Sequence, residues 1–419
     1  MKERIIGFLA CLFIIGQPNL RAQTGNADRL TLKQCVEAAI NNNLLVKQSD
    51  LQMKTGQVNL RQSRANLLPD LFAGLGHGIN QGRSIDPFTN SYINQQLSFA
   101  NYSLNSQVIL FNGFQMRNLI KQNSLTYEAN KMDLQQTKDN LTLNVILAYL
   151  QILNNEEQLQ QSRNQADVTL RQVERLNIMN QTGAIAPAQL YDLKGQLAND
   201  ELAIVNNRNA LNSAKLSLAQ LMNVTYKSNL EVEKITADTL TLLYNNDPAS
   251  LYNISVKQLA IVKAAEFRKQ SALKSVQVAK GFYYPTIALS GSFNTNYSTA
   301  AMRSVPLNTV ETASGDFVNL AGSKVPVMTT RTNYSSEKIP YRDQFNNNYN
   351  TQVYLSIRIP ILNGFDAKNR VALAKIDLKN AEAAAETVKI QLNQNIEQAY
   401  FNMTAAMEKY KTLQQQVRD

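Results

Sequence analysis

The chain has 419 residues, of which 44% are hydrophobic and 18% are charged, and it contains no tryptophan. Asparagine and glutamine are abundant, a composition that argues against a single large globular core. The formal net charge is +10, but the basic residues are scattered without a cluster or interleaved aromatic side chains, which argues against nucleic-acid binding.

The N-terminus has the pattern of a secretory signal peptide. Basic residues come first, an apolar run follows from Ile5 to Gly16, and a small residue stands at Ala22. We therefore expect residues 1–22 to be cleaved from the mature chain. No stretch reaches the roughly 18 uninterrupted apolar residues of a membrane-spanning helix, so the mature chain is expected to be soluble or to cross a membrane as strands.

The two cysteines differ in this interpretation. Cys11 lies inside the signal peptide, where a lipoprotein cleavage site is the weaker alternative. Cys35 is then the single cysteine of the mature chain, so an intrachain disulfide cannot form. We expect Cys35 to be a small residue on a helix face.

The first mature helix is predicted from about Thr31 to Ala65. Thr31 can cap its N-terminus, and Gln34 can reach back to it from three residues later. Pro69 ends the helical pattern because it lacks a backbone donor and restricts the residue before it.

Two strands are predicted next, separated by a polar loop at residues 81–97. The first, at residues 70–80, is rich in glycine. The second, at residues 101–110, alternates apolar and polar side chains, as expected of a strand with one wet face. Its apolar side carries Tyr102, Leu104, Val108 and Leu110.

The sequence period changes at the break Asn112-Gly113-Phe114. Beyond it, apolar residues recur every seven positions, which predicts a long supercoiled helix. The residues of this seam are Ile120, Tyr127, Leu134, Leu141 and Ala148. No glycine interrupts the pattern before Gly183, so the helix has roughly 65 residues and a length on the order of 100 Å.

A turn at residues 182–187 reverses the chain. Gly183 stands where the long helix ends, and Pro187 stands where the next helix begins. The returning helix ends near Asn223 and carries a second seam of apolar residues: Leu190, Leu197, Ile204, Leu211 and Leu218. Residues 224–246 form a mixed connecting segment, in which a strand is predicted at residues 229–235.

A new helix begins at Asp247, which is expected to cap it, and Pro248. Here a second copy of the first half starts. Residues 257–285 align without a gap on residues 41–69, displaced by 216 positions. We therefore assign residues 30–223 to a first structural repeat and residues 247–419 to a second.

The repeated strand and break return at residues 350–365, where the apolar alternation ends in Asn363-Gly364-Phe365. The displacement from the first copy is now 251 positions. The extra residues lie in a Ser-, Thr- and Asn-rich stretch at residues 296–348, which is interpreted as a long loop. A seven-residue seam follows the break: Val371, Leu378, Ala385, Leu392 and Ala399.

The second repeat stops at Asp419, before the position that corresponds to the Gly183 turn and its returning helix. We therefore expect the chain to be a fragment of a longer protein in which a second glycine-containing turn follows.

Each repeat supplies two strands of about ten residues, the length that a tilted strand needs to cross a bilayer. Four strands cannot close a barrel around an aqueous lumen, and open sheet edges are not tolerated in lipid. Several chains are therefore expected to share one barrel, and three chains give 12 strands.

The alternation predicts which side chains face lipid and which face a water-filled lumen. The expected lipid-facing residues are Leu104, Val108, Val353, Leu355 and Ile357. The expected lumen-facing residues are Ser103, Asn105, Gln107, Ser356 and Arg358. Aromatic residues near strand ends suit an interfacial belt, with plain packing as the alternative: Tyr102, Phe111, Phe114, Tyr283 and Tyr284.

From about Leu30 onward, the chain resembles the TolC-type outer membrane factors, the exit ducts of tripartite efflux pumps and type I secretion systems. The features that carry the resemblance are the opening LTLKQCVEAAINNN, the helix ends before Pro69 and Pro285, the paired Asn-Gly-Phe breaks and TGAIAPAQL at the turn. Two departures are Leu44, near a position where many members have proline, and the missing second helical hairpin.

The resemblance implies a mainly α fold with membrane β: a homotrimer with a periplasmic α-helical barrel, a 12-stranded outer-membrane β-barrel and an equatorial girdle that includes residues 224–246. It also implies that a periplasmic adaptor protein docks at the helical turn, while an inner-membrane pump supplies the energy. The docking residues are then Gly183, Ala184, Ile185 and Ala186. An ordinary helix connection explains Gly183 and Pro187 equally well.

Enzymatic chemistry has little support in the sequence. The single histidine, His77, lies in a glycine-rich strand and is expected to be a strand-surface residue, and the Asn-Gly breaks lack the glycine spacing of a phosphate loop. We expect no cofactor and no metal. Two other classes stay open: an exported coiled-coil adaptor or scaffold, which needs no paired amphipathic strands, and a secreted binding protein, which needs no helix of this length.

Overall fold

The computed structural model describes residues 29–85, 90–94, 96–235 and 247–418, so the predicted signal peptide lies outside the described residues. The chain divides into two compact units. The first comprises Met1–Gln48 and Thr137–Tyr244, and the second comprises Ser49–Gln136 and Asn245–Asp419. Among the described helices, none combines the length and the mean hydropathy that a membrane-spanning helix requires.

The first unit is helical. It contains all of α1 and α4, the first turn of α2, and the C-terminal two-thirds of α3. The bounds of these helices are Leu32–Asn42 for α1, Leu44–Ala65 for α2, Gln115–Gln181 for α3 and Pro187–Leu221 for α4. The predicted long helix is confirmed, with 67 residues in α3.

The predicted capping box at the start of α1 is also confirmed. The Gln34 amide donates to Thr31 Oγ1 over 3.2 Å, and the Thr31 amide donates to Gln34 Oε1 over 2.9 Å. The prediction of one continuous helix to Ala65 is wrong, because the chain is extended at Asn43. The Asn43 side chain accepts a hydrogen bond from the Leu45 amide over 2.9 Å and so offers the backbone a local alternative to the helix.

Tyr149 ties three segments of the first unit together. Its ring is buried on α3, and its hydroxyl lies 3.1 Å from the Leu30 carbonyl oxygen and 2.6 Å from that of Glu233. The predicted strand at residues 229–235 is wrong as a regular strand, since only an isolated parallel bridge between Leu30 and Val232 forms there.

The second unit contains a four-stranded antiparallel sheet in the order β1-β4-β5-β8. The two strands of each repeat pair with each other, β1 with β4 and β5 with β8. Strand β4 also pairs with β5 and so connects the two repeats. The strands are β1 (Phe72–Asn80), β4 (Leu97–Asn112), β5 (Thr286–Ser298) and β8 (Asn350–Arg358). Inside the predicted polar loop of the first repeat, a short pair forms from β2 (Arg83–Ile85) and β3 (Tyr92–Asn94).

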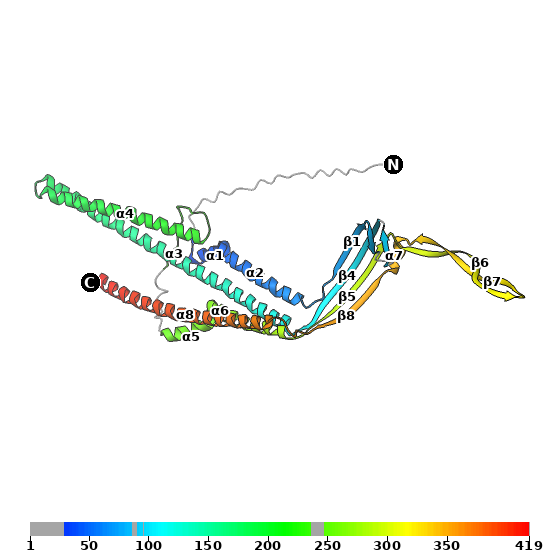
Figure 1. Cartoon of the computed structure of the whole chain (residues 1–419). Helices are drawn as coiled ribbons and strands as arrows, with labels where there is room; N and C mark the ends of the chain where they lie inside the picture. The colour runs from blue at the N-terminus through cyan, green and yellow to red at the C-terminus, as the bar shows by residue number, and fades with distance from the viewer. Residues whose placement is uncertain (1–28, 86–89, 95, 236–246, 419) are drawn as a thin grey trace, which may run out of the picture. The chain divides into compact units, whose positions relative to one another are not determined.

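The stretch at residues 296–348 is not a loop, so that prediction is wrong. It forms the long hairpin of β6 and β7, which continues from the end of the sheet, and the short helix α7 (Figure 1). The bounds are Met302–Leu320 for β6, Ser323–Lys338 for β7 and Tyr341–Asn347 for α7. Threonine is β-branched and favours strands, and the two hydroxyls of Thr309 and Thr332 lie 3.3 Å apart across the hairpin.

The helices of the second repeat complete this unit. They are α5 (Pro248–Gln258), α6 (Ala260–Lys280), the 3₁₀ turn η2 (Gly281–Tyr283) and α8 (Asp366–Arg418). Leu259 interrupts α5 and α6 at the position equivalent to Asn43, so both repeats share this break. Asp247 occupies the N-cap position with Pro248 at N1, but its side chain makes no capping hydrogen bond. Small and branched side chains pack α6 on α8: Val276, Ala279, Val371 and Ala374.

Cys35 has no exposed surface, in agreement with its expected place on a helix face, and burial raises the pKa of its thiol to about 11 from 9.0. We predict that alkylation of Cys35 between pH 8 and 9 is on the order of 100-fold slower in the folded chain than in the unfolded chain. Only the thiolate reacts, and a pKa that is higher by two units lowers the fraction of thiolate about 100-fold. Iodoacetamide labelling followed by mass spectrometry measures this rate.

The matched control is Lys33→Cys in a Cys35→Ala chain, since the Lys33 side chain is exposed. Its thiol should react at similar rates in folded and unfolded protein. Because the folded chain holds the Cys35 proton more tightly, stability should also fall as pH rises from about 9 towards 11. Equal labelling of Cys35 in both states contradicts the prediction.

Candidate functional site

The four-stranded sheet has two chemically different faces, which follow from the strand register. Cross-strand partners point to the same face of a sheet, and Leu104 lies opposite Phe293 while Ser103 lies opposite Asn294. One face carries mostly apolar residues, among them Leu75, Leu104, Val108, Leu289, Phe293, Val353, Leu355 and Ile357. The other carries mostly polar residues, among them Ser103, Asn105, Gln107, Ser290, Ser292, Asn294, Gln352, Ser356 and Arg358.

The five residues predicted to face a lumen therefore share one face, and the five predicted to face lipid share the other. One detail of the predicted alternation is wrong. A β-bulge between Ile109 and Phe111 leaves Leu110 without an opposite partner and places Phe111 opposite Ile287. The bulge shifts the alternation by one residue at the end of β4.

The apolar face and both outer strands are open in the single chain. Val353 on the apolar face is 70% exposed, and a contiguous exposed apolar surface of this kind marks an interaction surface. The strands β1 and β8 are the edges of the sheet. Edge strands present unpaired backbone donors and acceptors, which favour pairing with another chain.

The two strand-to-helix breaks have nearly the same backbone conformation. Gly113 and Phe114 have φ values of 64° and 62°, and Gly364 and Phe365 have 61° and 63°. Two successive residues in the left-handed region turn the chain sharply from strand to helix, and a phenylalanine there is uncommon. The predicted breaks at Asn112-Gly113-Phe114 and Asn363-Gly364-Phe365 are therefore structurally equivalent elements of the duplication.

Their surroundings differ. A Cβ on Gly113 would stand 2.8 Å from Tyr284 Cβ and would also meet the Gly281 carbonyl oxygen. A Cβ on Gly364 would meet nothing within 4 Å. The first break is thus packed on the second repeat, whereas the second break is uncovered in the single chain.

Four of the aromatic residues predicted near strand ends lie at the helical end of the sheet, and Tyr102 lies beside α7. Phe111 and Phe114 pack edge to face at the helical end of β4, with ring centroids 5.3 Å apart. Tyr283 and Tyr284, at the helical end of β5, are about half exposed. Tyr102 contacts Phe345 of α7, with centroids 5.6 Å apart.

The predicted tip of the helical hairpin is a compact turn between α3 and α4. Gly183 has φ of +71°, with open space around its Cα, and Pro187 stands at N1 of α4. The Ala184 amide closes the end of α3 by donating to the Met179 carbonyl over 2.9 Å. Residues 183, 184 and 186 are exposed and carry small side chains, and the larger Ile185 is half-buried.

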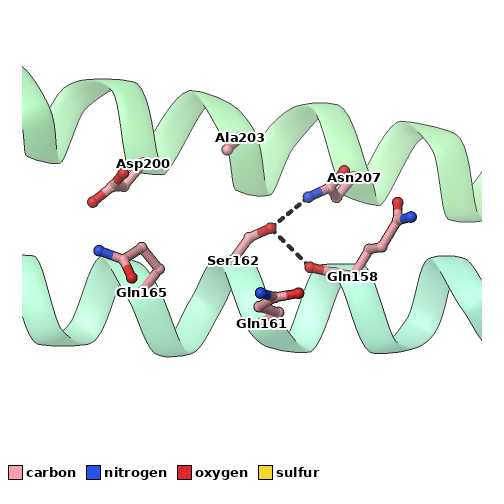
Figure 2. Close-up of a pocket in the computed structure, with 7 residues that line it drawn as sticks. All are labelled: Gln158, Gln161, Ser162, Gln165, Asp200, Ala203 and Asn207. Carbon is pink, nitrogen blue, oxygen red and sulfur yellow. Dashed lines mark hydrogen bonds between the residues drawn. The ribbon is translucent and has the colours of Figure 1, made fainter. Parts of the chain in front are cut away.

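Sequence reasoning missed a ladder of polar contacts between α3 and α4. The predicted apolar seam of α3 continues at its seven-residue spacing into Asn155, Ser162 and Thr169, and all three are bonded to α4. Asn155 donates to the Ala210 carbonyl over 3.1 Å. Asn207 donates to the Ser162 hydroxyl, and Figure 2 shows this contact beside the bond from Ser162 to the Gln158 carbonyl. We call these contacts the polar ladder. Extending the seam past Ala148 would have revealed it.

The third contact of the polar ladder, made by Thr169, includes a buried carboxylate. Asp200 is 7% exposed and accepts hydrogen bonds from Thr169 Oγ1 over 2.6 Å and from Gln196 Nε2 over 2.9 Å. An open cavity of about 290 Å³ lies along the ladder (Figure 2). It is lined by Gln158, Gln161, Ser162, Gln165, Asp200, Ala203 and Asn207.

The described part of the chain brings together no group of three or more His, Cys, Asp or Glu side chains that could hold a metal ion. His77 is exposed on β1, opposite Ala100 of β4.

The predicted site residues lie on three surfaces: the two-faced sheet, the strand-to-helix breaks and the helical tip.

Residues 35–224 and 256–419 match a family model described as outer membrane efflux protein. No curated protein sequence has significant similarity to the chain. Solved structures of similar fold include the outer membrane protein VceC from Vibrio cholerae, with a TM-score of 0.70 and 14% identity over 92% of this chain and 81% of that chain. CusC, which forms a transmembrane channel, has a TM-score of 0.68 and 16% identity over 92% and 76%. The Neisseria gonorrhoeae MtrE outer membrane channel has a TM-score of 0.61 and 16% identity over 91% and 74%.

The hydrogen bond between Thr169 and Asp200 can be tested by a double-mutant cycle. We predict that Thr169→Val and Asp200→Leu each destabilise the α3–α4 hairpin by about 1–3 kcal/mol, because each leaves a buried polar partner unsatisfied. The double variant should be less destabilised than the two effects added, since neither polar group then remains. Hydrogen exchange of the α4 amides in the full chain measures the local stability.

Glu201→Leu provides the control at the neighbouring exposed position of α4. It should change local stability by no more than about 0.5 kcal/mol. Strictly additive effects of the Thr169 and Asp200 substitutions contradict a direct contribution from their hydrogen bond.

Proposed function

Because the chain belongs to the outer membrane efflux protein family, we propose that it is a passive exit duct in the outer membrane of a Gram-negative bacterium. In this proposal it assembles as a homotrimer, conducts substrate received from a tripartite efflux pump or a type I secretion system, and catalyses no reaction. The strands lie in outer-membrane lipid, and the helical part lies in the periplasm.

The observation that carries this proposal is the two-faced sheet with two open edges. A sheet with one apolar and one polar face suits a wall between lipid and water. Open edges are not tolerated in lipid, so the wall must close on itself. Four strands from each of three chains give a 12-stranded barrel, with Ser103, Asn105, Gln107, Ser356 and Arg358 facing its lumen.

The helical hairpin supports the partner part of the proposal. Its tip, formed by Gly183, Ala184, Ile185 and Ala186, exposes three small residues and has open space around Gly183. We assign docking of a periplasmic adaptor protein to this tip. An inner-membrane pump supplies the energy, since the duct itself contributes only a path.

An exported coiled-coil adaptor or scaffold is the second candidate, because the 67-residue α3 suits such a protein. The paired amphipathic strands favour the duct. Extraction behaviour separates the two: a duct requires detergent and runs as a heat-modifiable trimer, whereas a scaffold is freely soluble.

Reconstitution in a planar lipid bilayer tests the duct. We predict a stable conductance whose reversal potential in a salt gradient shifts towards cation preference in Arg358→Glu, because Arg358 is the only charged residue on the polar face of β1, β4, β5 and β8. The control is Lys324→Glu, the same charge change in β7 beside the turn of the β6–β7 hairpin, which should shift the potential less. No conductance above the lipid background contradicts the proposal.

The docking assignment has its own test in efflux-dependent drug resistance. Gly183→Arg should abolish resistance while leaving trimer levels unchanged, because a large charged side chain blocks the tip. Gly183→Asn should retain resistance, since asparagine tolerates the left-handed conformation and is small. Gly195→Arg adds the same bulk in open space within α4 and should also be tolerated. Full resistance in Gly183→Arg rejects the docking role.

A further inference from the structure

Two small cavities lie at equivalent positions of the two repeats, each at a strand-to-helix break. The first, of about 80 Å³, adjoins the end of β4, and the second, of about 290 Å³, follows β8. We call them the first and the second junction cavity. Six lining residues of the first are Ile109, Leu110, Phe111, Asn112, Phe114 and Arg117. Their equivalents 251 positions later, residues 360–363, Phe365 and Lys368, line the second.

Each junction cavity combines apolar side chains with one cation that lies over an aromatic ring. Arg117 Cζ lies 5.8 Å from the centroid of the Phe114 ring, and Lys368 Nζ lies 5.5 Å from the centroid of the Phe365 ring. Both distances are within the range of a favourable cation–π contact. Because Arg117 and Lys368 are also exposed, each cavity has a positive charge at its rim that a ligand can reach.

The backbone holds both rings in an unfavourable conformation. Phe114 and Phe365 have φ values of 62° and 63°, where asparagine is much commoner than a bulky residue. Such strain persists where the surrounding structure imposes it, and it clusters at binding sites. The presence of phenylalanine at both copies of this position therefore points to a role for the ring itself.

Packing within the protein does not fill the first junction cavity. The break at Gly113 is already packed on Gly281 and Tyr284 of the second repeat. Leu110 nevertheless stays 58% exposed and Phe114 52% exposed beside the cavity. The hollow is thus a feature of the junction, and another molecule can occupy it.

The surroundings of both junction cavities are positively charged. Ten residues on either side of the first Gly-Phe pair, residues 103–124, include two basic residues and no acidic one. The equivalent residues 354–375 include four basic residues and one acidic residue, Asp366, which pairs with Arg370 over 2.8 Å. The whole chain has 42 basic and 32 acidic residues, so this excess is local and favours an anionic ligand.

The proposed duct places both junction cavities at one surface of the membrane. On β4, Tyr102 and Phe111 are nine positions apart, and a tilted strand crosses a bilayer in about 9–11 residues. Aromatic side chains favour the boundary between hydrocarbon and headgroups. Because the cavities adjoin the ends of β4 and β8 where the helices begin, they lie at the boundary on the periplasmic side.

We propose that each junction cavity binds an anionic phospholipid of the leaflet that faces the periplasm. The lipid phosphate pairs with Arg117 in the first cavity and with Lys368 in the second. The beginning of one acyl chain lies in the cavity against the phenylalanine ring. This proposal rests on the duct function proposed above, because the sheet must lie in a membrane.

The apolar lining favours a lipid over a free anion. Beside the second junction cavity, Ile361 is 94% exposed and Leu362 is 88% exposed. A soluble anion would leave these side chains in water, whereas an acyl chain covers them. A lipid with a negatively charged headgroup therefore satisfies both the apolar lining and the cation.

Native mass spectrometry of the full chain in a mild detergent tests the proposal, with phosphatidylglycerol as the anionic probe and zwitterionic phosphatidylethanolamine for comparison. We expect two phosphatidylglycerol molecules to bind each chain, at least about fivefold more tightly than phosphatidylethanolamine, since one basic residue beside an anionic lipid contributes about this factor. Arg117→Gln with Lys368→Gln should abolish the preference. Arg117→Lys should retain it, because the charge remains.

The matched control is Lys121→Gln with Lys375→Gln, which removes the same charge from exposed positions of α3 and α8 that do not line the cavities. It should change the phosphatidylglycerol affinity less than about twofold, because distant exposed charges are screened. Ile361→Ser tests the apolar part and should weaken phosphatidylglycerol binding, while the exposure of Ile361 protects the fold from the change.

Four outcomes would overturn the lipid sites. Glycerol 3-phosphate carries a phosphate without acyl chains, so displacement of phosphatidylglycerol by an equal concentration of it indicates a free-anion site. Equal losses in the two double variants indicate non-specific attraction by charge. A conducting trimer without a preference for phosphatidylglycerol overturns the lipid sites and leaves the duct intact. A water-soluble monomer that binds no phosphatidylglycerol overturns both.

Discussion

The unpaired backbone groups along β1 and β8 are the constraint on which the rest of the structure depends. A sheet with one apolar face cannot keep open edges in a membrane, because each unsatisfied donor or acceptor in hydrocarbon carries a penalty of several kcal/mol. The same sheet in water would expose its apolar face. In the proposed duct, pairing between copies satisfies the backbone groups of both edges, and lipid covers the apolar face.

The helical part of the chain is built on one long helix and the helix that returns beside it. Its long helix α3 extends from the break at Gly113 to the tip at Gly183, and α4 returns along it. Both ends of α3 are set by glycines with positive φ, so its length is determined by local backbone chemistry. Tyr149 then fastens the connecting segments at Leu30 and Glu233 to the middle of this helix.

Features that depend on a few neighbouring residues were predictable from the sequence. The capping box at Thr31, the breaks at Gly113 and Gly364, and the turn at Gly183 are local, and the two faces of the sheet follow from simple alternation. The bulge at Leu110 was not predictable, because it depends on how β4 meets β5. The β6–β7 hairpin was missed because its Thr, Ser and Asn content was taken as loop composition, although Ala321 and Gly322 at its turn both have positive φ, as tight hairpins require. The docking role of the tip and the orientation of the polar face remain proposals.

The polar ladder between α3 and α4 has a mechanical consequence. Where Asn155, Ser162 and Thr169 replace apolar residues in the seam, parting the helices exposes hydroxyl and amide groups that water can satisfy. Where an apolar side chain such as Leu190 of α4 is buried, parting exposes hydrocarbon at roughly 25 cal/mol for each Å². Separation of α3 from α4 therefore breaks hydrogen bonds at three positions and exposes apolar side chains along the rest of the contact.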